Sequence, residues 1–274
     1  MIRISGSVID PNAIMNQIPQ GDIEKNTFDI LSSSSKVYSF KSLNELNFEL
    51  SMRKSIVNAA IDLNNSSFSF RVFRKSRCNP DFWDRTNDGG FLLKKGVNPS
   101  DAIKDIYVHS SKYGTECATA MVIVYYKAVL DVFPEELFNR LFPEIYLMNW
   151  SHLDRDLGIR EYGPGEDDLP GDGMYFKNPD VNPLTPEWQG ENVIYLGNGK
   201  YYGHGIGISD EKEIIRALND NRISGSTVSA YRLDSVKRLD FKYLAQKYNS
   251  FTPPRDMGSY NAEWPVVYIP HPNN

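Results

Sequence analysis

Cys117 is the residue of this sequence whose type and position best suit nucleophilic chemistry. It stands straight after the loop 113–116, at the start of an apolar stretch that is predicted to be helical. The unpaired amides and the positive end of a helix stabilise a thiolate and lower its pKa. A buried free cysteine also behaves as a small hydrophobic residue. Position alone therefore leaves two interpretations open, a reactive nucleophile and a structural thiol.

The second cysteine, Cys78, lies among polar residues in a predicted loop, with no acidic or histidine neighbour. A thiol without such a partner is not activated, so we expect Cys78 to be a surface thiol without a role. Two cysteines cannot build a disulfide scaffold, and neither belongs to a CxxC pair that would bind zinc.

A catalytic thiolate needs a partner that exchanges its proton, and one predicted hairpin supplies two candidates. Asn198–Gly199 predicts a tight two-residue turn, because this pair tolerates positive φ angles. Counting outward from the turn places His204 opposite Val193. Glu191 then lies on the same face as His204, as a diagonal neighbour within side-chain reach. A one-residue bulge would break this register, and an exposed Glu–His surface pair is the other interpretation.

Composition excludes several classes of function. The chain has 274 residues, is 41% hydrophobic and carries a net charge of −5, so no basic field attracts nucleic acid or anionic lipid. No secretory signal and no stretch long enough to span a bilayer are visible, so we expect a protein made and retained in the cytoplasm, without a membrane partner. The acidic stretch Asp154–Asp172 lacks the alternation of a calcium loop and is expected to be solvated. Four scattered histidines form no HExxH motif, and we expect no metal and no cofactor.

The elements that must position these residues can be placed by capping and periodicity. Ser42 and Glu45 predict a capping box that begins a helix reaching Asn64–Asn65. Asn98–Pro99 predicts a second helix, with a capping side chain, that ends near His109. The apolar segment 115–133 predicts a central buried helix that Pro134 ends. Further elements are expected as follows: strands at 68–72, around 82–83 and 91–93, helix 135–141, strand 174–176, a hairpin of 192–196 with 201–208, helix 210–218, strand 229–233 and helix 241–247.

This order of elements favours an α+β domain, in which a mostly antiparallel sheet packs against a buried central helix. No internal repeat or change of composition divides the chain. We expect one domain over residues 1–248 and a proline-rich extension over 249–274 that is extended or loosely docked and is not needed for chemistry.

Three segments together resemble a known family. Residues 114–120 (GTECATA), 188–194 (WQGENVI) and 204–208 (HGIGI) are similar to the site segments of spore-coat transglutaminases (protein-glutamine gamma-glutamyltransferases) of endospore-forming bacteria. Residues 173–179 (GMYFKNP) are a further similar stretch. The resemblance extends to about residue 248.

The resemblance implies a papain-related fold like that of NlpC/P60 peptidases. It also implies calcium-independent isopeptide bond formation between glutamine and lysine side chains of spore coat proteins, through a cysteine thioester and with release of ammonia. By position, Cys117 would be the nucleophile, Glu191 its main acid–base partner, Glu116 a possible substitute, and His204 a support for this network. Phe70, Trp150 and Trp188 match aromatic residues that line the site, although tryptophan is also a common core residue.

Two other classes use the same residues and stay open at this point. A cysteine hydrolase of the NlpC/P60 type would use the same fold and nucleophile on cell-wall peptides. A non-catalytic coat component would keep the fold and need no thiolate. A transferase differs from a hydrolase in needing a dry site, because water competes for the thioester. The location implied for the transferase is the spore coat, after synthesis in the mother-cell cytoplasm without a signal peptide.

Overall fold

The computed structural model describes residues 1–252, and the expected extension from 253 onward lies outside the described residues. The helices in the described range are α1 (Pro11–Ile14), α2 (Asp22–Ser33), α3 (Leu43–Asn64), α4 (Pro99–Val108), α5 (Cys117–Val132), α6 (Glu135–Leu141), α7 (Glu211–Asn219) and α8 (Phe241–Ser250). The strands are β1 (Ile2–Ile4), β2 (Ser7–Val8), β3 (Tyr38–Phe40), β4 (Ser69–Phe70), β5 (Trp83–Arg85), β6 (Phe91–Leu93), β7 (Gly114–Thr115), β8 (Tyr146–Leu147), β9 (Ile159–Tyr162), β10 (Gly173–Lys177), β11 (Gly190–Gly197), β12 (Lys200–Gly203), β13 (Gly207–Asp210), β14 (Tyr231–Arg232) and β15 (Val236–Leu239).

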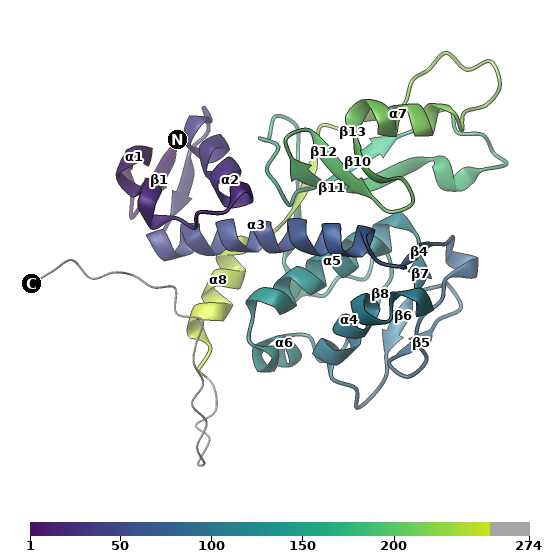
Figure 1. The fold of residues 1–274 in the computed structure, drawn as a ribbon, viewed down its shortest axis with the longest axis horizontal. Coiled ribbons are helices and arrows are strands. Elements are labelled where there is room, and N and C mark those ends of the chain that lie inside the picture. The colour runs from purple at the N-terminus through teal and green to yellow at the C-terminus, as the bar shows by residue number, and fades with distance from the viewer. Residues whose placement is uncertain (253–274) are drawn as a thin grey trace, which may run out of the picture.

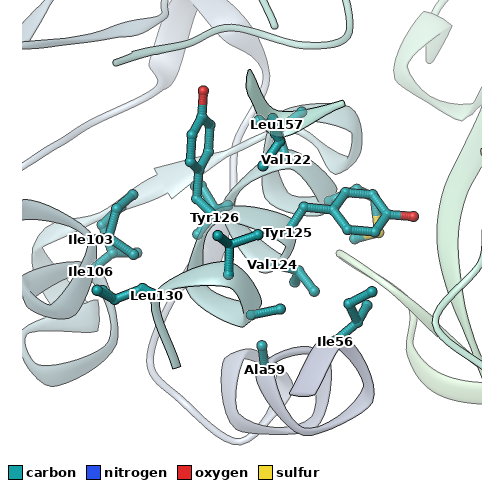
Figure 2. Close-up of a cluster of buried hydrophobic side chains, with 14 of the residues drawn as sticks. Ile56, Ala59, Ile103, Ile106, Val122, Val124, Tyr125, Tyr126, Leu130 and Leu157 are labelled. Atoms are coloured by element: carbon teal, nitrogen blue, oxygen red, sulfur yellow. The ribbon is translucent and has the colours of Figure 1, made fainter. Parts of the chain in front are cut away.

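Helix α5 is the centre of the molecule, as its uniform apolarity predicts. Of its 16 residues 13 are buried, because α3, α4, α6 and β11 all pack around it. Ile103 and Ile106 of α4, Ile56 and Ala59 of α3, and Val122, Val124 and Leu130 of α5 meet in one apolar cluster (Figure 2). Phe133 is the C-cap of α5, and Pro134 after it cannot continue the helix. The predicted central helix is confirmed.

The main sheet of the described part is antiparallel and seven-stranded, with the order β13-β12-β11-β10-β15-β9 and β14 beside β10. It lies on one side of the long helix α3, and α5 runs below that helix (Figure 1). A small sheet, β2-β1-β3, packs with α1 and α2 against the N-terminal end of α3. The predicted α+β class, with a mostly antiparallel sheet on a buried helix, is confirmed.

Local signals predicted several helix ends. The Ser42 hydroxyl accepts a hydrogen bond from the Glu45 N–H at 3.2 Å, as a capping box requires. The Glu45 carboxylate, however, accepts from the N–H of Lys41 and not from that of Ser42, so the box is only half formed. Asn98 precedes α4 as predicted, but it makes no side-chain capping bond to that helix. Helix α8 continues to Ser250, past the expected domain boundary at 248.

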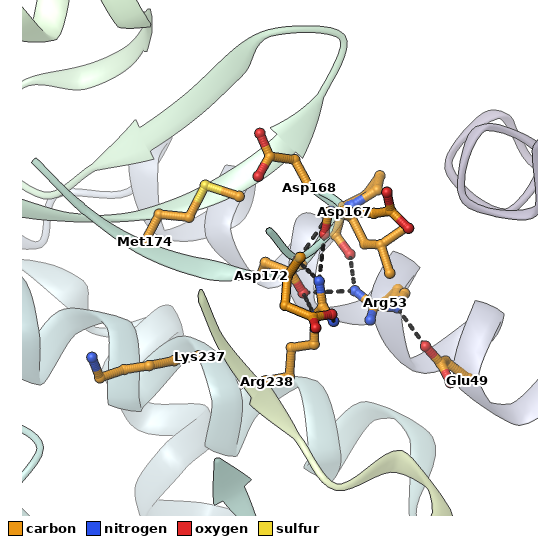
Figure 3. Close-up of polar contacts among 12 residues, drawn as sticks. Glu49, Arg53, Asp167, Asp168, Asp172, Met174, Lys237 and Arg238 are labelled. Atoms are coloured by element: carbon orange, nitrogen blue, oxygen red, sulfur yellow. Dashed lines mark hydrogen bonds and ion pairs between the residues drawn. The ribbon is translucent and has the colours of Figure 1, made fainter. Parts of the chain in front are cut away.

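Helix α2 and the strands around it, before Ser42, are elements that the sequence analysis did not predict. Most of the acidic stretch Asp154–Asp172 is exposed or half-buried, as expected, but its last residue, Asp172, is fully buried between Arg53 and Arg238 (Figure 3). Arg238 also pairs with Glu166 at 3.0 Å. Cations from α3 and β15, distant in sequence, thus pair with acidic residues at the C-terminal end of this stretch.

Candidate active site

Cys117 is the first residue of α5, and a short strand fixes the chain that leads into it. Strand β7 pairs in parallel with β4, so that Thr115 lies beside Phe70. Gly114 has no room for a side chain, because a Cβ there would lie 2.5 Å from the Ser69 hydroxyl oxygen. The strand expected over residues 68–72 is shorter in the structure, where it consists of the two residues of β4. Its role is to hold the nucleophile loop in place.

Glu116 caps the helix that carries the nucleophile. Its carboxylate accepts hydrogen bonds from the N–H groups of Ala118 at 2.5 Å and Thr119 at 2.7 Å, and from the Thr119 hydroxyl. An acidic residue at this position satisfies unpaired amides and interacts favourably with the helix dipole. Glu116 also borders the cavity in front of Cys117. The carboxylate thus has a structural task close to the sulfur.

Glu191 projects from β11 into the same region and is 5% exposed. Its Oε1 atom has no hydrogen-bond partner among the described residues. Gly203 on the paired strand leaves space for it, since a Cβ there would lie 3.0 Å from Oε1. Burial, and after it the negative charge of Glu116, raises the pKa of Glu191 well above its ordinary value. A carboxyl group with a raised pKa is suited to exchanging protons near neutral pH.

The predicted hairpin forms, but its register is shifted by one residue. A bulge at Leu196 leaves that residue unpaired, so Val193 lies opposite Gly203 and not opposite His204. Strand β12 then ends at Gly203, and His204 belongs to a tight turn before β13. The predicted His204–Val193 pairing is therefore wrong. The extra residue on β11 shifts the pairing of β11 with β12 by one position.

His204 lies in an aromatic environment. It is 4% exposed, its ring is 4.9 Å from the Phe68 ring centroid, and its Nδ1 is 3.0 Å from the Tyr202 hydroxyl. Burial lowers the pKa of His204 to about 4, so the imidazole is neutral at physiological pH. Its Nε2 has no partner among the described residues. The described hydrogen bonds include none between His204 and Glu191 or Cys117.

The surroundings of Cys117 disfavour a thiolate, although the sulfur lies at the start of a helix. Burial, and then the charges of Glu191 and Glu116, raise the pKa of the thiol above its ordinary value. The lowering of the thiol pKa that a helix start favours is outweighed here by desolvation and two carboxylates. The resting sulfur is consequently a thiol, and its proton must be removed as it reacts.

Asn192 is a site residue that sequence reasoning missed. Its Nδ2 donates to Cys117 Sγ at 3.3 Å, and its Oδ1 accepts from Trp150 Nε1 at 2.9 Å. Trp150 thus reaches the site through this amide and does not border the main cavity. The position of Asn192, adjacent to Glu191 in the sequence, could have suggested a role in the site. Strand alternation argued against that role, because it puts neighbouring side chains on opposite faces.

Two cavities border the reactive groups. The larger, about 700 Å³, exposes Cys117 and Asn192 and has apolar walls that include Phe70. The smaller, about 40 Å³, is bordered by Phe70, Trp188, Glu191 and His204. The structure therefore brings Cys117, Glu116, Glu191 and Asn192 together, and Phe70 and Trp188 form parts of the walls.

Within residues 1–252, no group of three or more His, Cys, Asp or Glu side chains is arranged to hold a metal ion. Among the described helices, none combines the length and apolarity needed to cross a membrane.

Comparison with known proteins identifies the family. Residues 1–248 match the family model of protein-glutamine gamma-glutamyltransferase. The protein of that name from Bacillus mycoides (strain KBAB4) is 45% identical over 258 residues, which cover 94% of this chain and 93% of that protein. The chain belongs to the protein-glutamine gamma-glutamyltransferase family.

Further relatives of this transglutaminase family agree. The protein of the same name from Bacillus cereus (strain B4264) is 44% identical and covers 92% of this chain and 91% of its own length. A solved structure, a transglutaminase from Geobacillus stearothermophilus without its C-terminal extension, superposes with a TM-score of 0.72 at 51% identity. The match covers 76% of this chain and 98% of that one. The resemblance to the transglutaminase family, stated from the sequence, is confirmed.

A transglutaminase is an acyltransferase that joins glutamine and lysine side chains of proteins, so the chain's substrates are proteins carrying these residues. Such an enzyme requires a nucleophile, a group that moves protons and a site that limits access of water. The described site contains a thiol, a buried carboxyl group with a raised pKa, and a largely apolar cavity.

Proposed function

We propose that this transglutaminase forms isopeptide bonds between spore coat proteins through a thioester on Cys117, with Glu191 as its proton-transfer partner and without calcium. The observation that carries the proposal is the position of Cys117. Cys117 lines the cavity of about 700 Å³. Glu191 is near enough to Cys117 for the carboxylate charge to raise the thiol pKa.

The proposed reaction has two balanced steps. In the first, Sγ of Cys117 attacks the glutamine carboxamide carbon while Glu191 takes the thiol proton. Glu191 then returns this proton to the leaving nitrogen, so that ammonia departs and the thioester remains. In the second, a lysine amine attacks the thioester, the carbon–sulfur bond breaks and Glu191 carries the amine proton to the departing thiolate. The product is an isopeptide, and no oxidant or reductant is needed.

The neutral thiol fits this sequence of events. Since the pKa of Cys117 is raised, a free thiolate is scarce and the proton must leave as the bond to carbon forms. Glu191 is suited to accept it because its own pKa is raised. His204 is neutral at this pH and is proposed to support the packing around Phe70 and the Glu191 side chain. Glu116 would substitute for Glu191 only at the expense of its capping bonds.

The walls of the site support transfer over hydrolysis. Phe70 and Trp188 border the small chamber beside Glu191, and Phe70 also borders the main cavity. Apolar walls reduce the number of water molecules that can reach a thioester and compete with the lysine amine.

Incubation with a glutamine-bearing protein and a fluorescent primary amine tests the proposal. We expect covalent labelling by the wild type and by Cys78→Ala, and none by Cys117→Ala. Deamidation or peptide cleavage without labelling would identify a hydrolase, and equal labelling by both variants would refute the assignment of Cys117. Excess EDTA should leave the initial rate unchanged, and a loss that calcium restores would refute calcium independence.

The cellular part of the proposal rests on the resemblance to the spore-coat enzymes. In a spore-forming bacterium that carries this gene, its deletion should lower the fraction of coat protein that resists extraction as high-mass material, and a gene encoding Cys117→Ala should not restore that fraction. Residues after Thr252 are proposed to serve attachment. A chain that ends at Thr252 should label as fast as the full chain, and a folded but inactive shortened chain would show that the extension completes the site.

A further inference from the structure

The amide of Asn192 is held between two groups that define its orientation. Trp150 Nε1–H is only a donor, so the Asn192 atom 2.9 Å from it must be the carbonyl oxygen. The amide nitrogen is therefore the end that faces Cys117 Sγ, at 3.3 Å. Oxygen and nitrogen of an asparagine are commonly ambiguous, but the indole donor removes that ambiguity here.

A hydrogen-bond donor matters for this sulfur because the charged side chains that act on it are negative. Glu191 and Glu116 both disfavour a thiolate, and so does burial. The hydrogen bonds from Asn192 favour the charged sulfur. Amide donors aimed at a group that gains charge stabilise it most where water is excluded.

Trp150 is placed to orient this donor. It is held in turn by the Tyr125 ring, 6.4 Å away between centroids, and by Lys237, whose ammonium lies 5.5 Å from the indole centroid. Tyr125 is itself fixed by hydrogen bonds to the backbone oxygens of Gly171 and Lys237. The indole therefore has a defined place between α5 and the sheet.

We propose that Asn192 is a catalytic residue that donates its side-chain N–H to the sulfur of Cys117, and that Trp150 is a positioning residue that holds the amide in the donating orientation. This rests on the proposed role of Cys117 as nucleophile. Asn192 transfers no proton. It stabilises the negative charge on sulfur when Glu191 removes the thiol proton, and again when the thioester carbon–sulfur bond breaks.

The pH dependence of Cys117 alkylation by chloroacetamide tests the donor directly, in a Cys78→Ala background so that one thiol reports. Hydrogen bonds to charged groups correspond to changes of about 10- to 100-fold. We expect Asn192→Ala to raise the apparent thiol pKa and to slow acylation by a glutamine substrate by about that factor. Asn192→Asp should slow acylation more than Asn192→Ala does, because a carboxylate replaces the donor and adds a third negative charge.

A double-mutant cycle separates positioning by Trp150 from cavity lining. Trp150→Phe keeps an aromatic ring and removes the Nε1–H, so it should lower kcat several-fold in the wild-type background with little change in KM. In the Asn192→Ala background the same change should have almost no effect, since the amide it orients is gone. Equal losses in both backgrounds would show that Trp150 acts through packing and would overturn its assignment.

Folding of each variant is checked by its thermal midpoint and by complete alkylation after denaturation. If Asn192→Ala does not fold, Trp150→Phe and Asn192→Asp carry the same test. An unchanged alkylation profile in folded Asn192 variants would overturn the donor role. Loss of alkylation in Cys117→Ala confirms that the assay reports this sulfur, so failure of the nucleophile assignment is seen separately.

Discussion

The proton that Cys117 must lose has Glu191 as its candidate acceptor, and Glu116 lies beside both. General acid–base catalysis contributes about 10²- to 10⁴-fold. We expect Glu191→Gln to slow single-turnover acylation of Cys117 by a factor in that range. Glu116→Gln should have a smaller effect, because glutamine keeps an oxygen that can accept the capping bonds.

If the two carboxylates can replace one another, the Glu116→Gln/Glu191→Gln double variant should acylate Cys117 far more slowly than either single variant. Acylation by a glutamine substrate is measured across pH for the wild type and all three variants. Should Glu191→Gln stay near wild type while His204→Ala falls to the level of Cys117→Ala, a Cys–His mechanism would replace the one proposed.

Burial of His204 links its protonation to folding. The folded chain binds a proton at this site only near pH 4, whereas the unfolded chain does so near 6.5. Stability is therefore unaffected above pH 6.5 and is lost as the pH falls from there toward 4, by about 3 kcal/mol in all. His204→Phe should remove this loss, because phenylalanine does not titrate and fits beside Phe68 and Phe70.

The measurement is the difference in the free energy of unfolding between wild type and His204→Phe at several pH values. Taking the difference removes the opposite contribution of Glu191, whose raised pKa favours the folded state at low pH. A difference that does not change between pH 7 and 4 would contradict a buried neutral imidazole.

At the scale of elements, the turn between β12 and β13 depends on one glycine. Gly205 has a φ of +112°, and a Cβ there would lie 2.9 Å from the Phe70 ring. Gly205→Ala should lower both stability, by about 1–3 kcal/mol, and the rate of amine incorporation, because Phe70 must move from the cavity wall.

Gly199→Ala is the matched control for backbone strain. Gly199 has a φ of +70°, but nothing lies within 4 Å of a Cβ placed there. This variant should lose stability and keep its amine incorporation rate per folded molecule. Similar activity in the two variants would mean that Phe70 does not need its observed position.

At the scale of the whole molecule, a buried ionic cluster joins the N-terminal part to the sheet. Asp172 accepts from Arg53 at 2.9 Å and from Arg238 at 2.8 and 2.9 Å, in the arrangement of Figure 3. Asp172→Ala would leave two buried guanidinium groups without this partner, and such losses typically amount to about 3–5 kcal/mol.

Glu135→Ala is the control, since it removes an exposed ion pair with Lys104 that contributes at most about 1 kcal/mol. Denaturant unfolding of both variants and the wild type measures the difference. If Asp172→Ala is no more destabilising than Glu135→Ala, the cluster does not hold the acidic stretch in place.

The features that depend on local chemistry could be predicted from the sequence alone. Helix starts at Ser42 and Pro99, the buried helix that begins at Cys117, and its end before Pro134 follow from capping, periodicity and the missing proline N–H. The motifs around Cys117 and Glu191 were long enough to indicate the family, and with it the α+β fold.

Features that depend on burial, or on contacts between residues distant in the sequence, could not be predicted before the fold was known. One extra residue at Leu196 moved His204 out of its predicted pairing, because a bulge leaves no clear mark in the alternation of side chains. The pKa of Cys117 rises, since desolvation and two carboxylates act only once the chain has folded. The Trp150–Asn192–Cys117 contacts join residues 42 and 75 positions apart, and no local pattern encodes such a meeting.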